Sequence, residues 1–265
     1  KDSLAKLNSN DELSTFFTAT LTSPLMERFC DEAEKVRELS LALTEKFVKQ
    51  CSTHNFTPFL TLFVPVFKAR LSLPYEEKSE EVRLLLVNLM LALLSHDTIS
   101  SVPDSVSSTI ANCLQDNFPE VKRQCCLVIV KLCKKSPDAV KIHSEKLLKA
   151  LTANSSHQHS KTRQMSIKAI GFVCVAGAPD NFEELMREVV LPCFKKSSFD
   201  RVPSVRKALI TGAIGKLAAI GVEGGAEILK TYEMFLPNFL SFFLLGVSDG
   251  TPEVEEISFT ELTKI

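Results

Sequence analysis

Two histidines, His157 and His159, are of a type and spacing that could do chemistry in this 265-residue chain. Imidazole nitrogens are common zinc ligands, and two rings this close in sequence could face one ion. A zinc site takes three or four ligands, however, and neither a third ligand nearby nor an H-E-x-x-H pattern accompanies the pair. The sequence therefore predicts no metal centre at these histidines.

Residues 212–217, with the sequence GAIGKL, resemble a phosphate-binding loop in outline. Such a loop needs a different glycine spacing and a Ser or Thr after the lysine, and this segment lies inside a helical pattern. We expect its small residues to let two helices approach closely. Adjacent acids such as Glu80 and Glu81 fit solvated turns. The sequence thus predicts a protein that is not an enzyme and binds no cofactor or small-molecule substrate.

Eight cysteines lie mostly inside apolar runs, and no two have the C-x-x-C spacing of a zinc or redox site. Buried thiols without disulfides are typical of a reducing compartment. We therefore expect a cytoplasmic protein.

The charge balance, 31 Lys and Arg against 32 Asp and Glu, argues against a generally basic nucleic-acid binder. The longest apolar stretches fall short of the roughly 20 residues that a membrane span needs. The chain opens on Lys1 with neither an initiator Met nor a signal sequence, so we expect it to be a fragment of a longer protein.

A short element recurs six times: a turn residue, then Val or a substitute, then a residue that is basic in the first five copies. We call the Val or its substitute the anchor, and the anchors are Val36, Val82, Val121, Thr162, Val205 and Val254. Their spacings of 46, 39, 41, 43 and 49 residues fit the 40–47 of HEAT and armadillo repeats better than the 33 or 34 of ankyrin and tetratricopeptide repeats.

Each anchor opens an apolar run at helical spacing, and another such run precedes it. The preceding runs are 13–21, 57–71, 105–114, 140–151, 182–194 and 226–245. Pro65, Pro192 and Pro237 are expected to bend or interrupt three of them, and loops are expected at 71–79, 95–104 and 221–225. The pattern predicts an all-α fold, an α-solenoid of about six HEAT-type helix pairs that forms a single domain over residues 1–265.

Positive charge is concentrated mid-chain, where residues 120–163 hold ten Lys or Arg against three acids. An acidic protein partner could bind there, or the basic residues could simply keep the surface soluble. The basic residues after the anchors would form a ladder along one edge. They either pair with the turn acids of neighbouring repeats or contact a partner, and the candidate contact residues are Lys122, Arg123, His157, His159, Lys161, Arg163 and Arg206.

Specific motifs lie between residues 118 and 254: FPEVKR at 118–123, SHQHSKTR at 156–163, and the repeat openings at 200–208 and 252–254. Over roughly 116–255 the chain resembles the HEAT-repeat family of dynein axonemal assembly factors, number five of that series. Two residues depart from the family pattern. Thr162 stands where the family favours Val, and Glu255 where an Arg is expected, which leaves a continuous basic ladder in doubt at the sixth repeat.

The resemblance implies a non-catalytic cytoplasmic scaffold that helps to pre-assemble dynein arms for cilia or flagella. Its partners would then be proteins: dynein subunits, other assembly factors and chaperones. A generic HEAT scaffold that binds tubulin, transport or phosphatase partners is the alternative. Tubulin-binding solenoids of the TOG type typically present a Trp at the first turn, and this chain has none.

Overall fold

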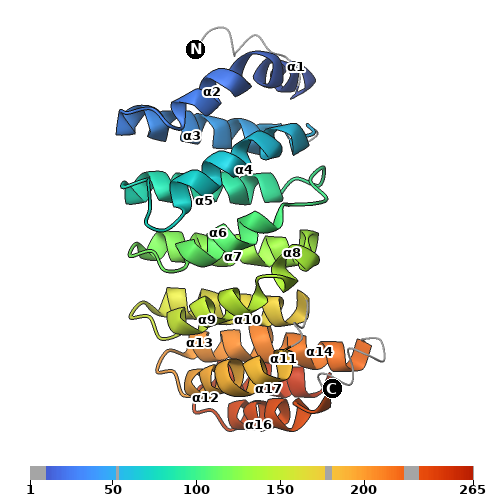
Figure 1. Cartoon of the computed structure of the whole chain (residues 1–265). Helices are drawn as coiled ribbons and strands as arrows, with labels where there is room; N and C mark the ends of the chain where they lie inside the picture. The colour runs from blue at the N-terminus through green and yellow to red at the C-terminus, as the bar shows by residue number, and fades with distance from the viewer. Residues whose placement is uncertain (1–9, 52–53, 177–180, 224–232, 265) are drawn as a thin grey trace. The chain divides into compact units, whose positions relative to one another are not determined.

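The computed structural model describes residues 10–51, 54–176, 181–223 and 233–264. Within these ranges the chain consists of helices and turns, without a strand (Figure 1). First and second helices alternate along the chain, so the fold is the predicted α-solenoid of about six helix pairs. The chain divides into two compact units, Lys1–Ser136 and Pro137–Ile265. None of the helices in the described ranges is long and apolar enough to cross a membrane.

The first unit holds three helix pairs. The first helices are α1 (Asn10–Phe16), η2 (Phe17–Leu21) and α2 (Thr22–Arg28) in succession, then α4 (Thr57–Leu71) and α6 (Asp104–Cys113); the second helices are α3 (Glu34–Gln50), α5 (Glu80–Leu94) and α7 (Pro119–Lys135). In Figure 1 the second helices stack in chain order, α3 against α5 and α5 against α7. Phe59, Phe63 and Phe67 recur every four residues on α4, which turns all three rings into the core.

The second unit holds the other three pairs. The first helices are α8 (Pro137–Lys141) with α9 (Ser144–Asn154), then α11 (Phe182–Leu185), η3 (Met186–Val190) and α12 (Leu191–Ser198) in succession, then α16 (Leu236–Val247); the second helices are α10 (Ser160–Ala176), then α13 (Pro203–Lys207), η4 (Ala208–Ile214) and α14 (Gly215–Glu223) in succession, then α17 (Pro252–Leu262). Residues from Pro203 to Glu223 thus continue as one helical run with a π-helical middle, and that middle packs against α10.

Local chemistry fixes where the second helices begin. Pro119, Pro203 and Pro252 occupy the first turn of α7, α13 and α17, where a missing N–H leaves no hydrogen bond unmade. At the start of α5 the hydroxyl of Ser79 accepts a hydrogen bond from the N–H of Val82 at 3.4 Å. All six anchors lie in the first turns of second helices, as the repeat spacing predicts.

The close approach predicted for residues 212–217 is confirmed. A Cβ atom on Gly171 of α10 would lie 2.4 Å from the carbonyl oxygen of Gly212 and 2.6 Å from the Cα of Ala213. The backbones of α10 and η4 are therefore in close contact at Gly171 and Gly212, where neither helix has a side chain. Gly171, the partner glycine on α10, lies outside the sequence pattern of residues 212–217.

The structure differs from the predicted helices in three details. The run 140–151 is two helices, α8 and α9, separated at residues 142–143, where the hydroxyl of Ser144 donates to the carbonyl of Lys141 at 2.8 Å and so satisfies the end of α8. Pro65 does not interrupt α4, which continues through it. Residues 221–223 are the end of α14 and not a loop. Residues 224–232, which hold the end of the predicted loop 221–225 and the start of the run 226–245, lie outside the described ranges.

Candidate protein-interaction edge

The turns that precede the second helices form one edge of each unit, and a repeated ion pair links consecutive turns. We call the residue five positions before each anchor the turn residue. It is acidic in five of the six repeats: Asp31, Glu77, Asp116, Asp200 and Asp249. In four places an Arg directly after an anchor reaches the turn acid of the next repeat along the chain.

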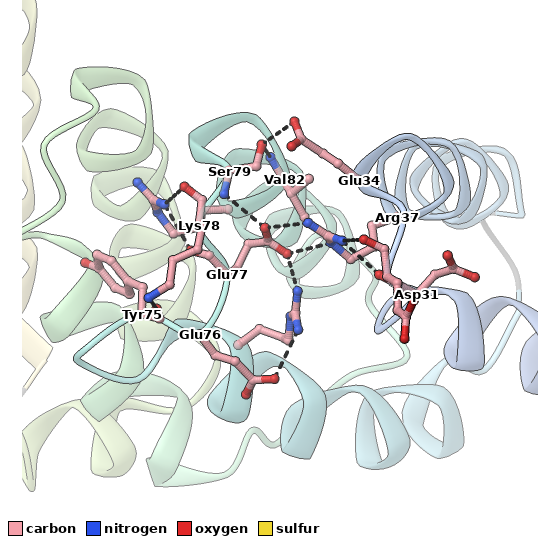
Figure 2. A network of polar contacts seen from close by, with 12 residues as sticks. Asp31, Glu34, Arg37, Tyr75, Glu76, Glu77, Lys78, Ser79 and Val82 are labelled. Atoms are coloured by element: carbon pink, nitrogen blue, oxygen red, sulfur yellow. Dashed lines mark hydrogen bonds and ion pairs between the residues drawn. The ribbon is translucent and has the colours of Figure 1, made fainter.

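Glu77 is held by two arginines (Figure 2). Arg37 donates from Nε to Oε2 of Glu77 at 2.8 Å and from Nη2 to Oε1 at 3.0 Å, and Nη2 of Arg70 also donates to Oε2. The backbone N–H of Ser79 donates to Oε1 at 3.0 Å. The Glu77 side chain is fully buried. Burial alone would raise the pKa of this carboxyl group, but the two arginines and the Ser79 N–H outweigh burial and hold the pKa below its usual value.

Arg83 repeats the arrangement one step further along the chain. Its Nε and Nη2 donate to the Asp116 carboxylate at 2.6 and 3.0 Å. Its Nη1 donates to the carbonyls of Glu77 and Lys78 at 3.1 and 2.9 Å, and its guanidinium carbon lies 4.8 Å from the centre of the Tyr75 ring. A planar guanidinium group can donate hydrogen bonds to a carboxylate and to the carbonyl groups of a turn at the same time. A lysine ammonium group cannot do this with the same geometry.

The second unit contains two further pairs. Arg163 donates to the Asp200 carboxylate at 2.7 and 2.8 Å, and Arg206 donates to Asp249 at 2.6 and 2.8 Å. Burial would raise the pKa of Asp200, but hydrogen bonds from Arg163 and from a backbone N–H lower it on balance. The hydrogen bond from Arg206 is the main reason why the pKa of Asp249 is also lowered.

For four of the basic residues the structure contains the first of the two predicted kinds of contact, the pairing with turn acids. Arg37, Arg83, Arg163 and Arg206 are paired with turn acids of the next repeat. Two of them, Arg163 and Arg206, are among the predicted contact residues. Their guanidinium groups hold neighbouring turns together, so they position the edge.

The predicted contact residues of the third repeat lie in α7, in the first unit. Lys122 is half-buried, and this burial lowers the pKa of its ammonium group. Arg123 is also half-buried and forms an ion pair with Glu120 one turn earlier in the same helix. Both side chains therefore present only part of their length to solvent.

The remaining predicted residues meet at the turn before α10, in the second unit. His157 stands at the turn position that is acidic in the other repeats, and its Nδ1 accepts a hydrogen bond from the N–H of His159 at 3.1 Å. Carboxylates accept the equivalent bond at Asp200 and Asp249. The two imidazole rings lie 5.3 Å apart, and Arg163 donates to the carbonyl of His157 at 2.9 Å. His159 and Lys161 are exposed beside them.

A hollow of about 610 Å³ opens at this turn. Its lining includes His157, Arg163, Lys196, Phe199 and Arg201. The last three belong to the following repeat and were not singled out in the sequence. The sequence signal that indicates this hollow is Phe199, a large apolar residue directly before a turn acid. In the described part of the chain no group of three or more His, Cys, Asp and Glu side chains could hold a metal.

Comparison with known proteins supplies the family. A family model described as Dynein axonemal assembly factor 5-like, TPR repeats, matches residues 1–264. The mouse protein named dynein axonemal assembly factor 5 is 27% identical over 248 residues, which cover 91% of this chain and 27% of the relative. The human protein of that name is 29% identical, and the match covers 88% of this chain and 26% of the relative. The chain thus spans about a quarter of the length of the curated relatives it matches.

Solved structures confirm the fold. A designed armadillo repeat protein in complex with the peptide (KR)4 matches 92% of this chain and 99% of its own length, with a TM-score of 0.65 and 15% identity. Kap121p bound to RanGTP matches 97% of this chain and 25% of its own length, with a TM-score of 0.66 and 13% identity. At such low identity the likeness concerns the repeat solenoid alone.

Proposed function

The chain belongs to the dynein axonemal assembly factor 5-like family, and we propose that it is part of a non-catalytic cytoplasmic scaffold that assists the pre-assembly of axonemal dynein arms. The family match over residues 1–264 is the observation that carries this proposal. Curated relatives that share the name of an assembly factor point to dynein assembly, and together with the repeat fold they point away from catalysis.

The architecture suits such a role physically. Stacked helix pairs expose a series of turns, each of which can make one weak contact with a large client. Several weak contacts on one chain raise the overall affinity, because each contact increases the effective concentration for the next. All eight cysteines lie within the described ranges and are free thiols there, the state that a reducing compartment such as the cytoplasm maintains.

An affinity pull-down of the tagged full-length protein from the cytosol of ciliated cells, read by mass spectrometry, tests the proposal. Recovery of dynein heavy or intermediate chains together with chaperones and other assembly factors is the expected result. Recovery of tubulin, transport factors or a phosphatase without any dynein subunit would overturn it and leave a generic repeat scaffold.

A basic contact edge for an acidic client is the finer part of the proposal. The predicted residues with solvent-exposed cationic or imidazole groups at the fourth repeat, His159 and Lys161, would make the contact there. Lys122 and Arg123 would add the third repeat, while Arg163 and Arg206 hold the turns in place.

Lys161→Glu tests this edge, and the chain offers a matched control. Lys35 lies directly before the first anchor, as Lys161 lies directly before the fourth, and its side chain is 75% exposed. Charge reversal at Lys161 is expected to weaken dynein capture several-fold, whereas Lys35→Glu leaves it unchanged. Equal capture by both variants would remove Lys161 from the edge.

We also propose that residues 1–265 form a single repeat domain. One cooperative unfolding transition followed by both circular dichroism and tryptic cleavage supports this. Separate transitions for Lys1–Ser136 and Pro137–Ile265 would show two domains.

A further inference from the structure

Phe199 occupies a position that no other repeat fills with a large apolar residue. It lies six residues before the anchor, and its side chain is 70% exposed. The residues at this position in the six repeats are Cys30, Glu76, Gln115, Ser156, Phe199 and Ser248. Exposure of a phenylalanine to water has a free-energy cost, and exposed aromatic residues often serve as binding anchors.

Two hollows in the second unit meet at this ring. Phe199 lines the hollow of about 610 Å³ at the turn before α10, and it also lines a second hollow of about 560 Å³ between α12 and α16. These two helices lie side by side in Figure 1. The two hollows are therefore neighbouring halves of one surface that share the Phe199 side chain.

The second hollow is an apolar groove. Leu191 and Phe199 lie two turns apart on the α12 side, and Phe242 and Leu245 face them from α16. Leu245 is 45% exposed. Helix α16 carries no charged residue, so that wall of the groove is neutral throughout. A branched or aromatic side chain would fit between these walls.

Charge around Phe199 is positive. Lys195 lines the apolar groove, while Lys196 and Arg201 line the hollow at the turn. Asp200 lines the hollow at the turn, and its carboxylate is already bound by Arg163. Lys196 donates to the hydroxyl of Ser156, a neutral partner, at 2.9 Å. A partner that is complementary to this surface is therefore anionic at one end and apolar at the other.

We propose that this surface docks a short linear segment of a partner protein in which acidic residues adjoin an aromatic or branched aliphatic residue. The acidic side chains lie over Lys196 and Arg201, and the apolar side chain enters the groove between α12 and α16 beside Phe199. The inference goes beyond dynein assembly, because it specifies the chemistry of the segment and would hold for a client of any kind.

Selection from a displayed library of random 12-residue peptides by the purified full-length protein tests the proposal. Peptides that combine acidic residues with an aromatic or branched aliphatic residue are expected to be enriched. Enrichment of basic peptides, or no enrichment over the bare support, would overturn it. Failure of the dynein pull-down would leave this result standing, and failure of the selection would leave the pull-down standing, so the two proposals fail separately.

Variants then locate the site, with the most enriched peptide as the labelled probe in fluorescence anisotropy. Phe199→Ser is expected to weaken binding about tenfold or more, and the double reversal Lys196→Glu with Arg201→Glu to weaken it similarly. The controls are Phe259→Ser, at a phenylalanine that is 60% exposed on α17, and Lys141→Glu, at an exposed lysine on α8. Equal losses in the controls would place the peptide elsewhere.

A second copy of the chain is the competing occupant. Sedimentation of wild type and Phe199→Ser over a range of concentrations distinguishes the two. A monomer at every concentration is expected for both. Concentration-dependent dimerisation that Phe199→Ser abolishes would show that the surface binds another copy, and would overturn the peptide proposal.

Discussion

The guanidinium group of Arg37 and the carboxylate of Glu77 face each other across a separation of 40 residues, joined by hydrogen bonds of 2.8 and 3.0 Å. Arg70 binds the same carboxylate, so one fully buried acid is held by two arginines (Figure 2). The first two repeats of the chain are therefore linked by a charged contact as well as by their apolar core. The same bidentate pairing recurs at Arg83, Arg163 and Arg206.

Replacement of Glu77 by Gln is expected to lower the free energy of unfolding by about 3–5 kcal/mol. The amide keeps the shape of the side chain but leaves Arg37 and Arg70 without a counter-charge in a buried place. Urea unfolding followed by circular dichroism measures the change.

Glu76→Gln is the matched control for that variant. Glu76 contacts Arg70 at 3.1 Å, but its side chain is 62% exposed. Water screens such a pair, so a change within about 1 kcal/mol is expected. Similar losses for both variants would mean that burial of the acid does not set the strength of the pairing.

The repeat anchors could be predicted from sequence because helix starts, prolines and anchor spacing are local signals. The ladder of ion pairs could be predicted only as one of two alternatives, since in the sequence each Arg lies near its own turn residue and far from the turn acid of the next repeat. Arg70 gave no signal at all, because it lies at the end of a first helix and meets Glu77 only after the loop folds back. Gly171 and the hollows around Phe199 were missed for the same reason: each depends on how helices from different repeats pack.

Acid is expected to weaken the fold through the turn acids. The pKa values of Glu77, Asp200 and Asp249 are lowered in the folded state, so the unfolded chain binds more protons than the folded chain as these groups titrate. Their contribution to stability is fully present above the unfolded values near pH 4 and is lost as the pH falls through the lowered folded values. When unfolding is measured from pH 7 to pH 2.5, the urea concentration at the midpoint should therefore decrease once the pH is below about 5.

Asp200→Asn isolates one of these groups. The variant is expected to be less stable than the wild type at pH 7 and to lose less stability on acidification, because one titrating carboxylate is gone. Parallel curves for the two proteins would show that Asp200 does not contribute to the acid sensitivity.

Thr162 is the anchor that differs from the other five, which are valines. Its side chain is fully buried, and its Oγ1 has no hydrogen-bond partner among the residues that the structure describes. Thr162→Val removes this unsatisfied hydroxyl with little change in shape, so a gain of roughly 1–3 kcal/mol in unfolding free energy is expected. Thr211→Val is the control, because that hydroxyl donates to the carbonyl of Lys207 at 3.0 Å. A gain at Thr211 as large as that at Thr162 would attribute the effect to helix propensity.

Gly171→Ala tests the contact between α10 and η4. The added methyl group would lie 2.4 Å from the carbonyl oxygen of Gly212 and 2.6 Å from the Cα of Ala213, both backbone atoms that cannot rotate away. The two helices must then move apart, and a loss of roughly 1–3 kcal/mol or more is expected in thermal or urea unfolding. At Gly250 the same substitution meets nothing within 4 Å, and Ala restricts the unfolded chain, so Gly250→Ala should be neutral or slightly stabilising. An unchanged midpoint for Gly171→Ala would mean that the helices are not held at this distance in solution.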